Sequence, residues 1–156
     1  MLRIRHYLPG EEPFLRELFF NSVRNINCRD YSQTQIQAWA AEQYDPLEWQ
    51  ALIKSINPFV VTLKDEIVAY GSLQSDGYID HFFCHYLHQK NGFAKALMRL
   101  LLRTGKDIGI KRFYADVSIT AKPFFEYFGF MVVKEQLVEK NGVLLKNYLM
   151  EKTFAL

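Results

Sequence analysis

Five side chains of types that commonly bind metals fall within nine residues of the stretch YIDHFFCHYLH (78–88). They are Asp80, His81, Cys84, His85 and His88. On a helix, the three histidines would recur at i, i+4 and i+7 on one face, which is a plausible arrangement for zinc. The first question is therefore whether this stretch is helical or extended.

A strand is the better interpretation, because the stretch follows a Ser-Asp-Gly turn and is rich in aromatic residues. In a strand, His81 and His85 share one face, while Asp80 and Cys84 share the other. Residues four apart then lie about 13 Å apart, at about 3.3 Å per residue. Zinc ligands all lie within about 2.3 Å of the ion. One extended segment cannot supply three of them, so we expect no metal site here.

The six residues that follow, QKNGFA (89–94), join this strand to an amphipathic helix. The first N–H groups of a helix have no partner within the helix and point at whatever lies before it. Gly92 and Ala94 carry little or no side chain, so a pyrophosphate could approach the backbone closely. The pattern fits an anion-binding loop, although a plain structural turn fits this short segment equally well.

Length and composition indicate one domain, residues 1–156, with enough apolar residues (49%) for a sizeable core. The net charge of +2 and the scattered basic residues argue against nucleic acid or an anionic membrane as a partner. Two cysteines, Cys28 and Cys84, are too few for a disulfide framework. There is no apolar run of about 20 residues and no signal-peptide core near the N-terminus. We expect a cytoplasmic protein.

The periodicity of apolar residues predicts the elements that position these groups. Strands are expected at 2–7, 58–63, 67–74, 78–84 and 111–118, and in a final hairpin across Lys140-Asn141-Gly142. Helices are expected at 11–23, 32–41, 45–56, 92–106 and 120–128. This order predicts an α+β or mixed α/β domain around one largely antiparallel sheet.

Two motifs resemble a known family. The segment QKNGFA resembles the Gln/Arg-x-x-Gly-x-Gly/Ala signature of the GNAT superfamily of acetyl-CoA-dependent N-acetyltransferases. The segment ADVSITAKPFFEYFGFMVV (115–133) is similar to the family's second landmark, and the order of elements matches the GNAT fold across nearly the whole chain. INCRDYS and QIQAWA resemble a bacterial subgroup of small, mostly uncharacterised members. The resemblance implies a mixed, mostly antiparallel sheet flanked by helices, and acetyl-CoA as co-substrate.

By this resemblance, the pyrophosphate of acetyl-CoA lies on the backbone amides of the loop, although Asn91 replaces a basic residue common in the family. The main chain at the end of the 78–84 strand is expected to bind the pantetheine arm and polarise the thioester carbonyl. Ser118 occupies the position of an Asn that faces the arm in many members. The residues that the resemblance places at acetyl-CoA are Phe82, Phe83, Cys84, Gln89, Lys90, Asn91, Gly92, Phe93, Ala94, Ser118 and Phe125.

The reaction requires a group that takes a proton from the amine and a group that protonates the departing thiolate. Asp80 occupies the position of the family's acid that takes or relays the amine proton, and it could equally well only bind the ammonium. His81 is a competing base. The usual Tyr proton donor is replaced by Phe125, which leaves Cys84 and Tyr127 as candidate catalytic side chains, with Tyr127 about 200° around the helix from Phe125. Tyr114, a tyrosine from the acceptor side and water are alternatives.

The acceptor site is expected between the early helices and the last hairpin, where Arg29, Asp30 and Tyr31 form a polar patch and Trp39 lies nearby. A solvated loop with a core tryptophan explains this patch equally well. The leading hypothesis is an N-acetyltransferase acting on the primary amine of a small molecule or peptide. A non-catalytic acyl-CoA sensor and a zinc-binding regulator are the competing hypotheses. The chain is expected to be a monomer or a homodimer formed through the last hairpin.

Overall fold

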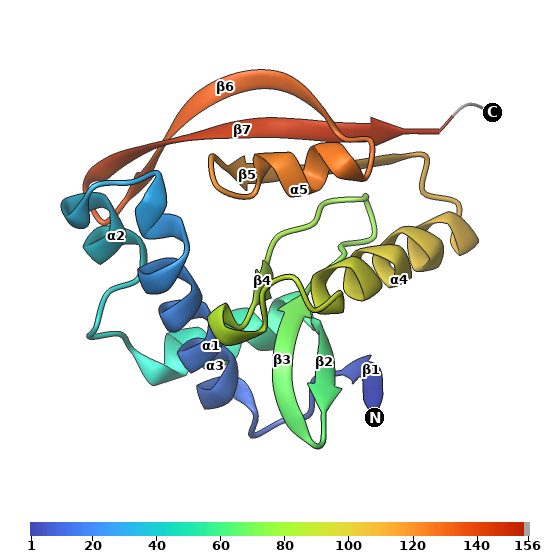
Figure 1. Cartoon of the computed structure of the whole chain (residues 1–156), viewed down its shortest axis with the longest axis horizontal. Coiled ribbons are helices and arrows are strands. Elements are labelled where there is room, and N and C mark those ends of the chain that lie inside the picture. The colour runs from blue at the N-terminus through green and yellow to red at the C-terminus, as the bar shows by residue number, and fades with distance from the viewer. Residues whose placement is uncertain (155–156) are drawn as a thin grey trace.

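A computed structural model describes residues 1–154 (Figure 1). Four antiparallel strands form the first sheet in the order β1-β2-β3-β4. They are β1 (Leu2–His6), β2 (Phe59–Leu63), β3 (Glu66–Gly71) and β4 (Phe82–Cys84). β2 and β3 are joined by a tight turn in which Lys64 and Asp65 both have positive φ angles. This sheet contains the expected strands at 2–7, 58–63 and 67–74, within one to three residues at each end.

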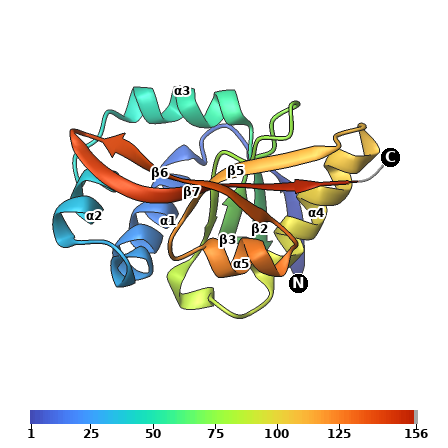
Figure 2. The ribbon, with the colours of Figure 1, turned by 90° about the horizontal axis from the view of Figure 1, so that it is seen from above.

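The last three strands form a second sheet, in the order β5-β7-β6. They are β5 (Arg112–Ser118), β6 (Met131–Lys140) and β7 (Val143–Thr153). Asn141 and Gly142 connect β6 to β7 with φ angles of 47° and 81°, as the Asn-Gly pair predicts for a two-residue hairpin turn. The long hairpin reaches from the helix α2 (Gln33–Trp39) to the end of the helix α4 (Phe93–Asp107) (Figures 1 and 2).

The expectation of one continuous sheet was wrong, and so was the single strand at 78–84. Tyr78 forms an isolated parallel bridge with Tyr114 of β5, whereas only residues 82–84 pair with β3. Gly77 allows this, because its φ angle is +99° and a Cβ there would collide with the carbonyl of Arg112. The 78–84 segment therefore begins beside β5 and then turns away to pair with β3 in the other sheet, which leaves a split between β4 and β5.

Three helices cover one face of the first sheet, and a fourth covers the other face. α1 (Glu12–Asn25), α2 (Gln33–Trp39) and α3 (Pro46–Ile56) bury their apolar residues against Val60 and Tyr70. α2 begins with a capping box between Ser32 and Gln35, and α3 begins with Asp45 as N-cap and Pro at its first position. A short 3-10 segment, η1 (Asn27–Arg29), connects α1 to α2.

α4 (Phe93–Asp107) packs Leu97, Met98 and Leu101 against Val61 and Ala69 on the opposite face. Neighbouring residues of β2 and β3 thus face opposite layers, as strand geometry requires. α5 (Lys122–Tyr127) ends at Gly129, whose positive φ angle of 87° closes the helix before the buried Phe130. A 3-10 segment, η2 (Tyr86–His88), precedes the loop to α4. Within residues 1–154, no helix is both long and apolar enough to cross a membrane.

Candidate active site

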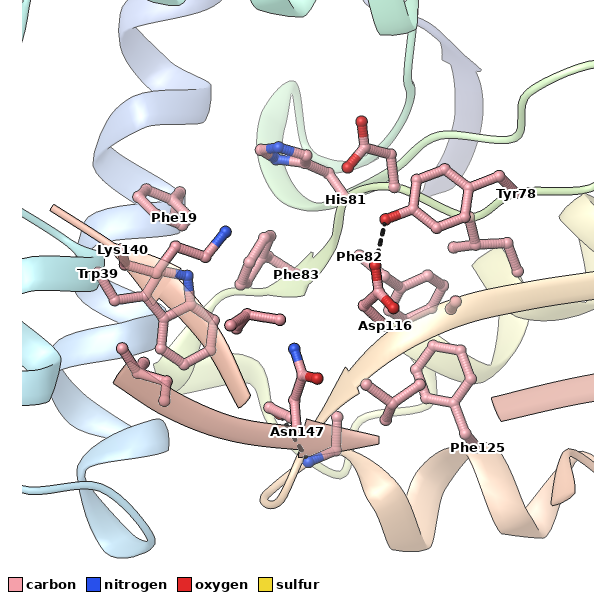
Figure 3. Close-up of a pocket in the computed structure, with 18 of the residues that line it drawn as sticks. Phe19, Trp39, Tyr78, His81, Phe82, Phe83, Asp116, Phe125, Lys140 and Asn147 are labelled. Atoms are coloured by element: carbon pink, nitrogen blue, oxygen red, sulfur yellow. Dashed lines mark hydrogen bonds between the residues drawn. The ribbon is translucent and has the colours of Figure 1, made fainter. Parts of the chain in front are cut away.

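A pocket of about 370 Å³ opens where β4 and β5 separate (Figure 3). Its walls come from α1, α2 and α3 on one side, from the 78–83 segment and β5 on another, and from the β6–β7 hairpin on the third. Both β4 and β5 are edge strands of their sheets, so each has main-chain groups free to pair with an extended ligand. Phe82 and Phe83 of β4 line this pocket.

The loop before α4 has the geometry of an anion site. Gly92 is the N-cap of α4 with a φ angle of 80°, and no side chain caps this end of the helix. An added Cβ at Gly92 would meet nothing within 4 Å, so the approach to the first N–H groups of α4, at Phe93 and Ala94, is open. Lys90 also has a positive φ angle, of 70°, which helps the loop to turn over the helix end. These residues fit a pyrophosphate group.

Gln89 holds this loop to the end of β4. Its side-chain amide donates to the carbonyl oxygen of Cys84 at 3.0 Å and to that of His85 at 3.3 Å. His85 in turn accepts a hydrogen bond from the N–H of Leu87 through Nδ1. The side chains of Gln89, Lys90 and Asn91 are exposed, so the part of the loop that can surround a phosphate is main chain.

Cys84 is not in the pocket. Its side chain is buried in the apolar cluster under α4, and its thiol Sγ lies 3.8 Å from the carbonyl oxygen of His88. Burial raises the pKa of the Cys84 thiol to about 11. Asp80 and Cys84 were expected to share one strand face, but Asp80 lines the pocket and Cys84 does not. The alternation fails because residues 78–81 do not continue β4 as one regular strand.

The residues expected near the thioester lie on β5 and α5. Phe125 is buried and lines the pocket, in edge contact with the rings of Phe82 and Phe130. The Ser118 hydroxyl oxygen accepts from the N–H of Ala121 at 3.0 Å and from Asn27 Nδ2 at 3.3 Å. Its proton is therefore free to point into the pocket. Tyr127 lies outside the pocket, 62% exposed, with the Lys95 ammonium over its ring.

Two carboxylates line the pocket, Asp80 before β4 and Asp116 on β5. Among residues 1–154, neither forms a salt bridge. Asp116 accepts hydrogen bonds from the Tyr78 hydroxyl at 2.9 Å and from Gln136 at 2.6 Å. Desolvation in the pocket raises the pKa of Asp80, Lys140 opposes this shift, and Asp116 adds to it. Asp80 is thus an exposed carboxylate at the split between the sheets, with no salt-bridge partner within residues 1–154.

His81 also lines the pocket, but its ring is held among aromatic side chains. Phe19, Trp49 and Phe83 surround it, with ring centroids 5.8 to 6.2 Å away. Burial, together with a smaller effect of the nearby Lys140 ammonium, lowers the pKa of His81 to about 4. The Tyr70 hydroxyl lies 3.0 Å from His81 Nδ1. Burial keeps the pKa of Tyr70 well above its usual value, so this phenol stays protonated at neutral pH and is able to donate to Nδ1.

The polar patch expected for the acceptor is only partly at the pocket. Tyr31 and Trp39 line it, whereas Arg29 and Asp30 are exposed and lie outside it. The Tyr31 hydroxyl is used inside the protein, because it donates to the carbonyl of Lys146 at 2.6 Å and accepts from the N–H of Ile119. It joins the connection before α2 to β7 and to the residue that follows β5, which helps to set the width of the pocket on this side.

Sequence reasoning missed four polar residues of the pocket: Arg16, Asp116, Lys140 and Asn147. Asp116 could have been found, because it alternates with buried residues along β5 on the same face as Ser118. The other three come from α1 and the last hairpin, far away in the sequence. No local pattern marks them.

Within the part of the chain that the structure describes, no three His, Cys, Asp or Glu side chains gather as a metal site. His85 and His88 lie beside each other, with ring centroids 5.3 Å apart, near the start of α4. Their aromatic neighbours are Tyr86, stacked on His85, and Phe93, tilted against His88.

Comparisons with known proteins agree with this geometry. A family model described as an acetyltransferase (GNAT) domain matches residues 27–152. The uncharacterised N-acetyltransferase YafP of Escherichia coli (strain K12) is 34% identical over 149 residues, covering 96% of this chain and 94% of that protein.

Solved structures give the same fold. A GCN5-related N-acetyltransferase from Rhodopseudomonas palustris superposes with a TM-score of 0.93 at 26% identity, over 97% of this chain and 95% of that one. The Salmonella typhimurium protein yncA, solved with its cofactor acetyl-CoA, has a TM-score of 0.71 at 15% identity, over 97% of this chain and 93% of that one. The chain belongs to the GNAT family of acetyltransferases and is an acetyl-CoA-dependent acyltransferase.

Proposed function

We propose that this enzyme transfers the acetyl group of acetyl-CoA to the primary amine of a small molecule or peptide. The observation that carries this proposal is the position of Asp80 and Asp116. Both carboxylates lie on the pocket wall at the split between β4 and β5, and neither is paired with a cation in residues 1–154. A protonated amine can form charge-assisted hydrogen bonds with both carboxylates.

The donor would be held by main chain. The N–H groups at the start of α4 and the free edge of β4 fit the pyrophosphate and the pantetheine arm respectively. When bound, acetyl-CoA supplies an activated thioester, so that the acceptor nitrogen gains the acetyl carbon as the C–S bond breaks and sulfur keeps the electron pair. Phe125 and Phe82 form an apolar wall that would keep water away from this exchange.

Asp80 is the better candidate for taking the proton from the amine. Its pKa is raised by its surroundings, which makes it a stronger base than a carboxylate with an ordinary pKa. His81 is a poor base here, because its pKa is about 4 and its Nδ1 is already engaged by the Tyr70 hydroxyl. Asp116, fixed by Tyr78 and Gln136, would hold the ammonium before the proton leaves.

The departing thiolate would take its proton from water. Tyr78 is the pocket phenol closest in position to Asp116, but burial and this carboxylate raise the pKa of its hydroxyl far above that of a thiol. Proton transfer from such a phenol to a thiolate is uphill. Cys84 is buried away from the pocket, and Tyr127 is exposed outside it. A thiolate is a good leaving group, so the reaction does not require a matched acid.

The test is a calorimetric titration with acetyl-CoA, followed by an amine panel in which free CoA thiol is measured. We expect micromolar binding of acetyl-CoA and thiol release that depends on the amine, with the acetylated amine identified by mass spectrometry. Tight acetyl-CoA binding without release for any primary amine would overturn the choice of acceptor. Failure to bind acetyl-CoA would contradict the assignment of the α4 loop.

A further inference from the structure

The polar groups of the pocket are separated by chemical type. The wall formed by the 78–80 segment and β5 presents Asp80 and Asp116, which accept hydrogen bonds when ionised. Lys140 and Trp39 lie on the opposite side, next to Phe19, and Figure 3 shows Asp116 and Tyr78 across the cavity from them. The side chains of this second wall that can bond a ligand are donors only.

Arg16 of α1 belongs to the second wall. It lies one turn before Phe19, and its guanidinium carbon is 5.2 Å from the Phe19 ring, 5.2 Å from the Trp49 ring and 4.2 Å from the Tyr44 ring. One nitrogen, Nη2, donates to the carbonyl oxygen of Ala41 at 2.6 Å. Within residues 1–154 it has no carboxylate partner, and burial lowers the pKa of the guanidinium. This cation is fixed, partly desolvated and unpaired.

Lys140 and Trp39 complete this wall. Lys140 ends β6, and the next residue, Asn141, donates from its side chain to the carbonyl oxygen of Ala38 at 2.7 Å. This hydrogen bond docks the hairpin tip on α2 and brings the Lys140 ammonium into the pocket beside Trp39 (Figure 3). In residues 1–154, Lys140 forms no salt bridge and the Trp39 indole N–H has no protein acceptor.

We propose that the acceptor is a small amine that also carries a carboxylate, an inference that rests on the proposed function. The ammonium lies toward Asp80 and Asp116. The carboxylate lies toward Arg16, Lys140 and Trp39. Each of the four charged side chains of the pocket then lies next to a group of opposite charge. Two cations and two anions line the pocket, so it is neutral by itself and stays neutral when this acceptor binds.

Other amines fit this arrangement less well. A polyamine would place its second cation against Arg16 and Lys140, where like charges in a partly desolvated pocket repel strongly. An amine without an anion would displace water from Arg16 and leave its charge without a partner. Both classes of amine can bind to Asp80 and Asp116, but neither offers an anion to Arg16 and Lys140.

The space between the two walls is apolar and aromatic. Phe19, Phe83 and Leu145 line it, so the body that joins the two charges of the acceptor should be apolar or aromatic. Asn147 of β7 also faces the cavity in Figure 3, and its buried Oδ1 has no hydrogen-bond partner among residues 1–154. A donor on the acceptor, such as a second amine proton or an amide N–H, would satisfy it.

The first test compares matched amines that differ only in the carboxylate. Phenylalanine is paired with phenethylamine, 4-(aminomethyl)benzoate with benzylamine, and 4-aminobutyrate with butylamine. We expect kcat/KM to be about 10- to 100-fold higher for the carboxylate in at least one pair, the range of charge-assisted hydrogen bonds. Equal or better turnover of all three amines without a carboxylate would overturn the inference and leave the acetyltransferase assignment intact.

Variants show which wall produces the preference. Lys140→Met and Arg16→Met each remove a positive charge with little change in side-chain length. Each variant should reduce the kcat/KM advantage of the amine that carries a carboxylate, while turnover of the matched amine without a carboxylate changes less. Lys140→Arg and Arg16→Lys should keep most of it. Lys134→Met, an exposed lysine on the same strand outside the pocket, is the control. If the preference for the amine with a carboxylate persists in both Lys140→Met and Arg16→Met, these two residues do not bind the carboxylate and the inference is wrong.

A binding measurement does not depend on turnover. Titration of the enzyme with 3-phenylpropanoate, which has no amine, is compared with 3-phenylpropanamide. We expect the carboxylate to bind at least about 10-fold more tightly, and Lys140→Met to remove most of this difference. Equal binding of the two overturns the inference. If the carboxylate binds but no amine is acetylated, the assignment of Arg16, Lys140 and Trp39 as a carboxylate site would be correct and the proposed function would be wrong.

Discussion

The two halves of the pocket are built in different ways. The half that fits acetyl-CoA is formed by one continuous stretch, residues 82–94, and its binding groups are main-chain N–H and C=O groups. The acceptor half is formed by side chains from α1, α2, α3 and the β6–β7 hairpin, which are far apart in the sequence. A main-chain site tolerates changes of side chain. A side-chain site can change its ligand through single substitutions, and this explains how one family fold can serve many acceptors.

The strongest way to test the donor half is to block the start of α4. Gly92→Glu places a carboxylate where the pyrophosphate should lie, and like charges in contact cost several kcal/mol, so we expect at least ~100-fold weaker acetyl-CoA binding by calorimetry.

Gly109→Glu is the matched control for this change. Gly109 follows the other end of α4 with a φ angle of 89°, and a Cβ there also meets nothing within 4 Å. The two variants therefore share the backbone strain and the added charge. Undiminished binding in Gly92→Glu, or equal losses in both variants, would remove the loop from the site.

The acceptor half is tested by Asp80→Asn, which keeps the shape of the side chain and removes the base. We expect kcat to fall by ~100-fold while the Kd for acetyl-CoA stays within about twofold, because a general base contributes about this much and does not touch the donor. The exposed Asp107→Asn on α4 serves as control. An unchanged kcat would mean that Asp80 is not the base, and Asp116 would then be the carboxylate to test as the base.

The local part of this picture was predictable. The caps at Ser32 and Asp45, the Asn141-Gly142 turn and the open Gly92 at the start of α4 depend on interactions within a few residues. The sequence contains those interactions directly. The same reason explains why the GNAT signature is found in the donor loop.

The acceptor half was not predictable from local patterns. Lys140 reaches the pocket only because Asn141 bonds to Ala38, 103 residues away. The burial of Cys84 and the position of His81 follow from a change of partner within residues 78–84, where the chain is bridged to β5 at Tyr78 and is paired with β3 from Phe82 onward. Strand alternation assumes one regular strand across 78–84, and the structure has two short pairings instead.

His81 belongs to the acceptor half, and its protonation should lower the stability of the folded protein. Its pKa is lowered to about 4 in the folded protein, whereas an unfolded histidine titrates near 6.5. The unfolded chain therefore binds more protons below about pH 6.5, and stability is lost as the pH falls from there toward 4. Between pH 7 and pH 5 this contributes roughly 2 kcal/mol of lost stability.

The measurement is urea denaturation at several pH values for the parent and for His81→Gln, with half-exposed His85→Gln as control. The groups around His81 are Tyr70 on β3, Lys140 on β6, and the rings on α1, α3 and β4. We expect His81→Gln to flatten the acid side of the profile, and His85→Gln to leave it unchanged. Identical slopes in all three proteins would show that His81 can be protonated without loss of the fold.

The smallest expected effect lies where the two halves meet, at Phe125. Its ring is 4% exposed and lines the pocket, at the position where the family resemblance led us to expect a tyrosine acid. Phe125→Tyr adds a hydroxyl beside the departing sulfur, and we expect kcat near pH 7 to rise only a few-fold, because a thiolate leaves readily without an acid. Phe124→Tyr, on the same helix outside the pocket, is the control. A rise of 100-fold would mean that protonation of the thiolate limits the parent enzyme, and that water is a poor substitute for the missing phenol.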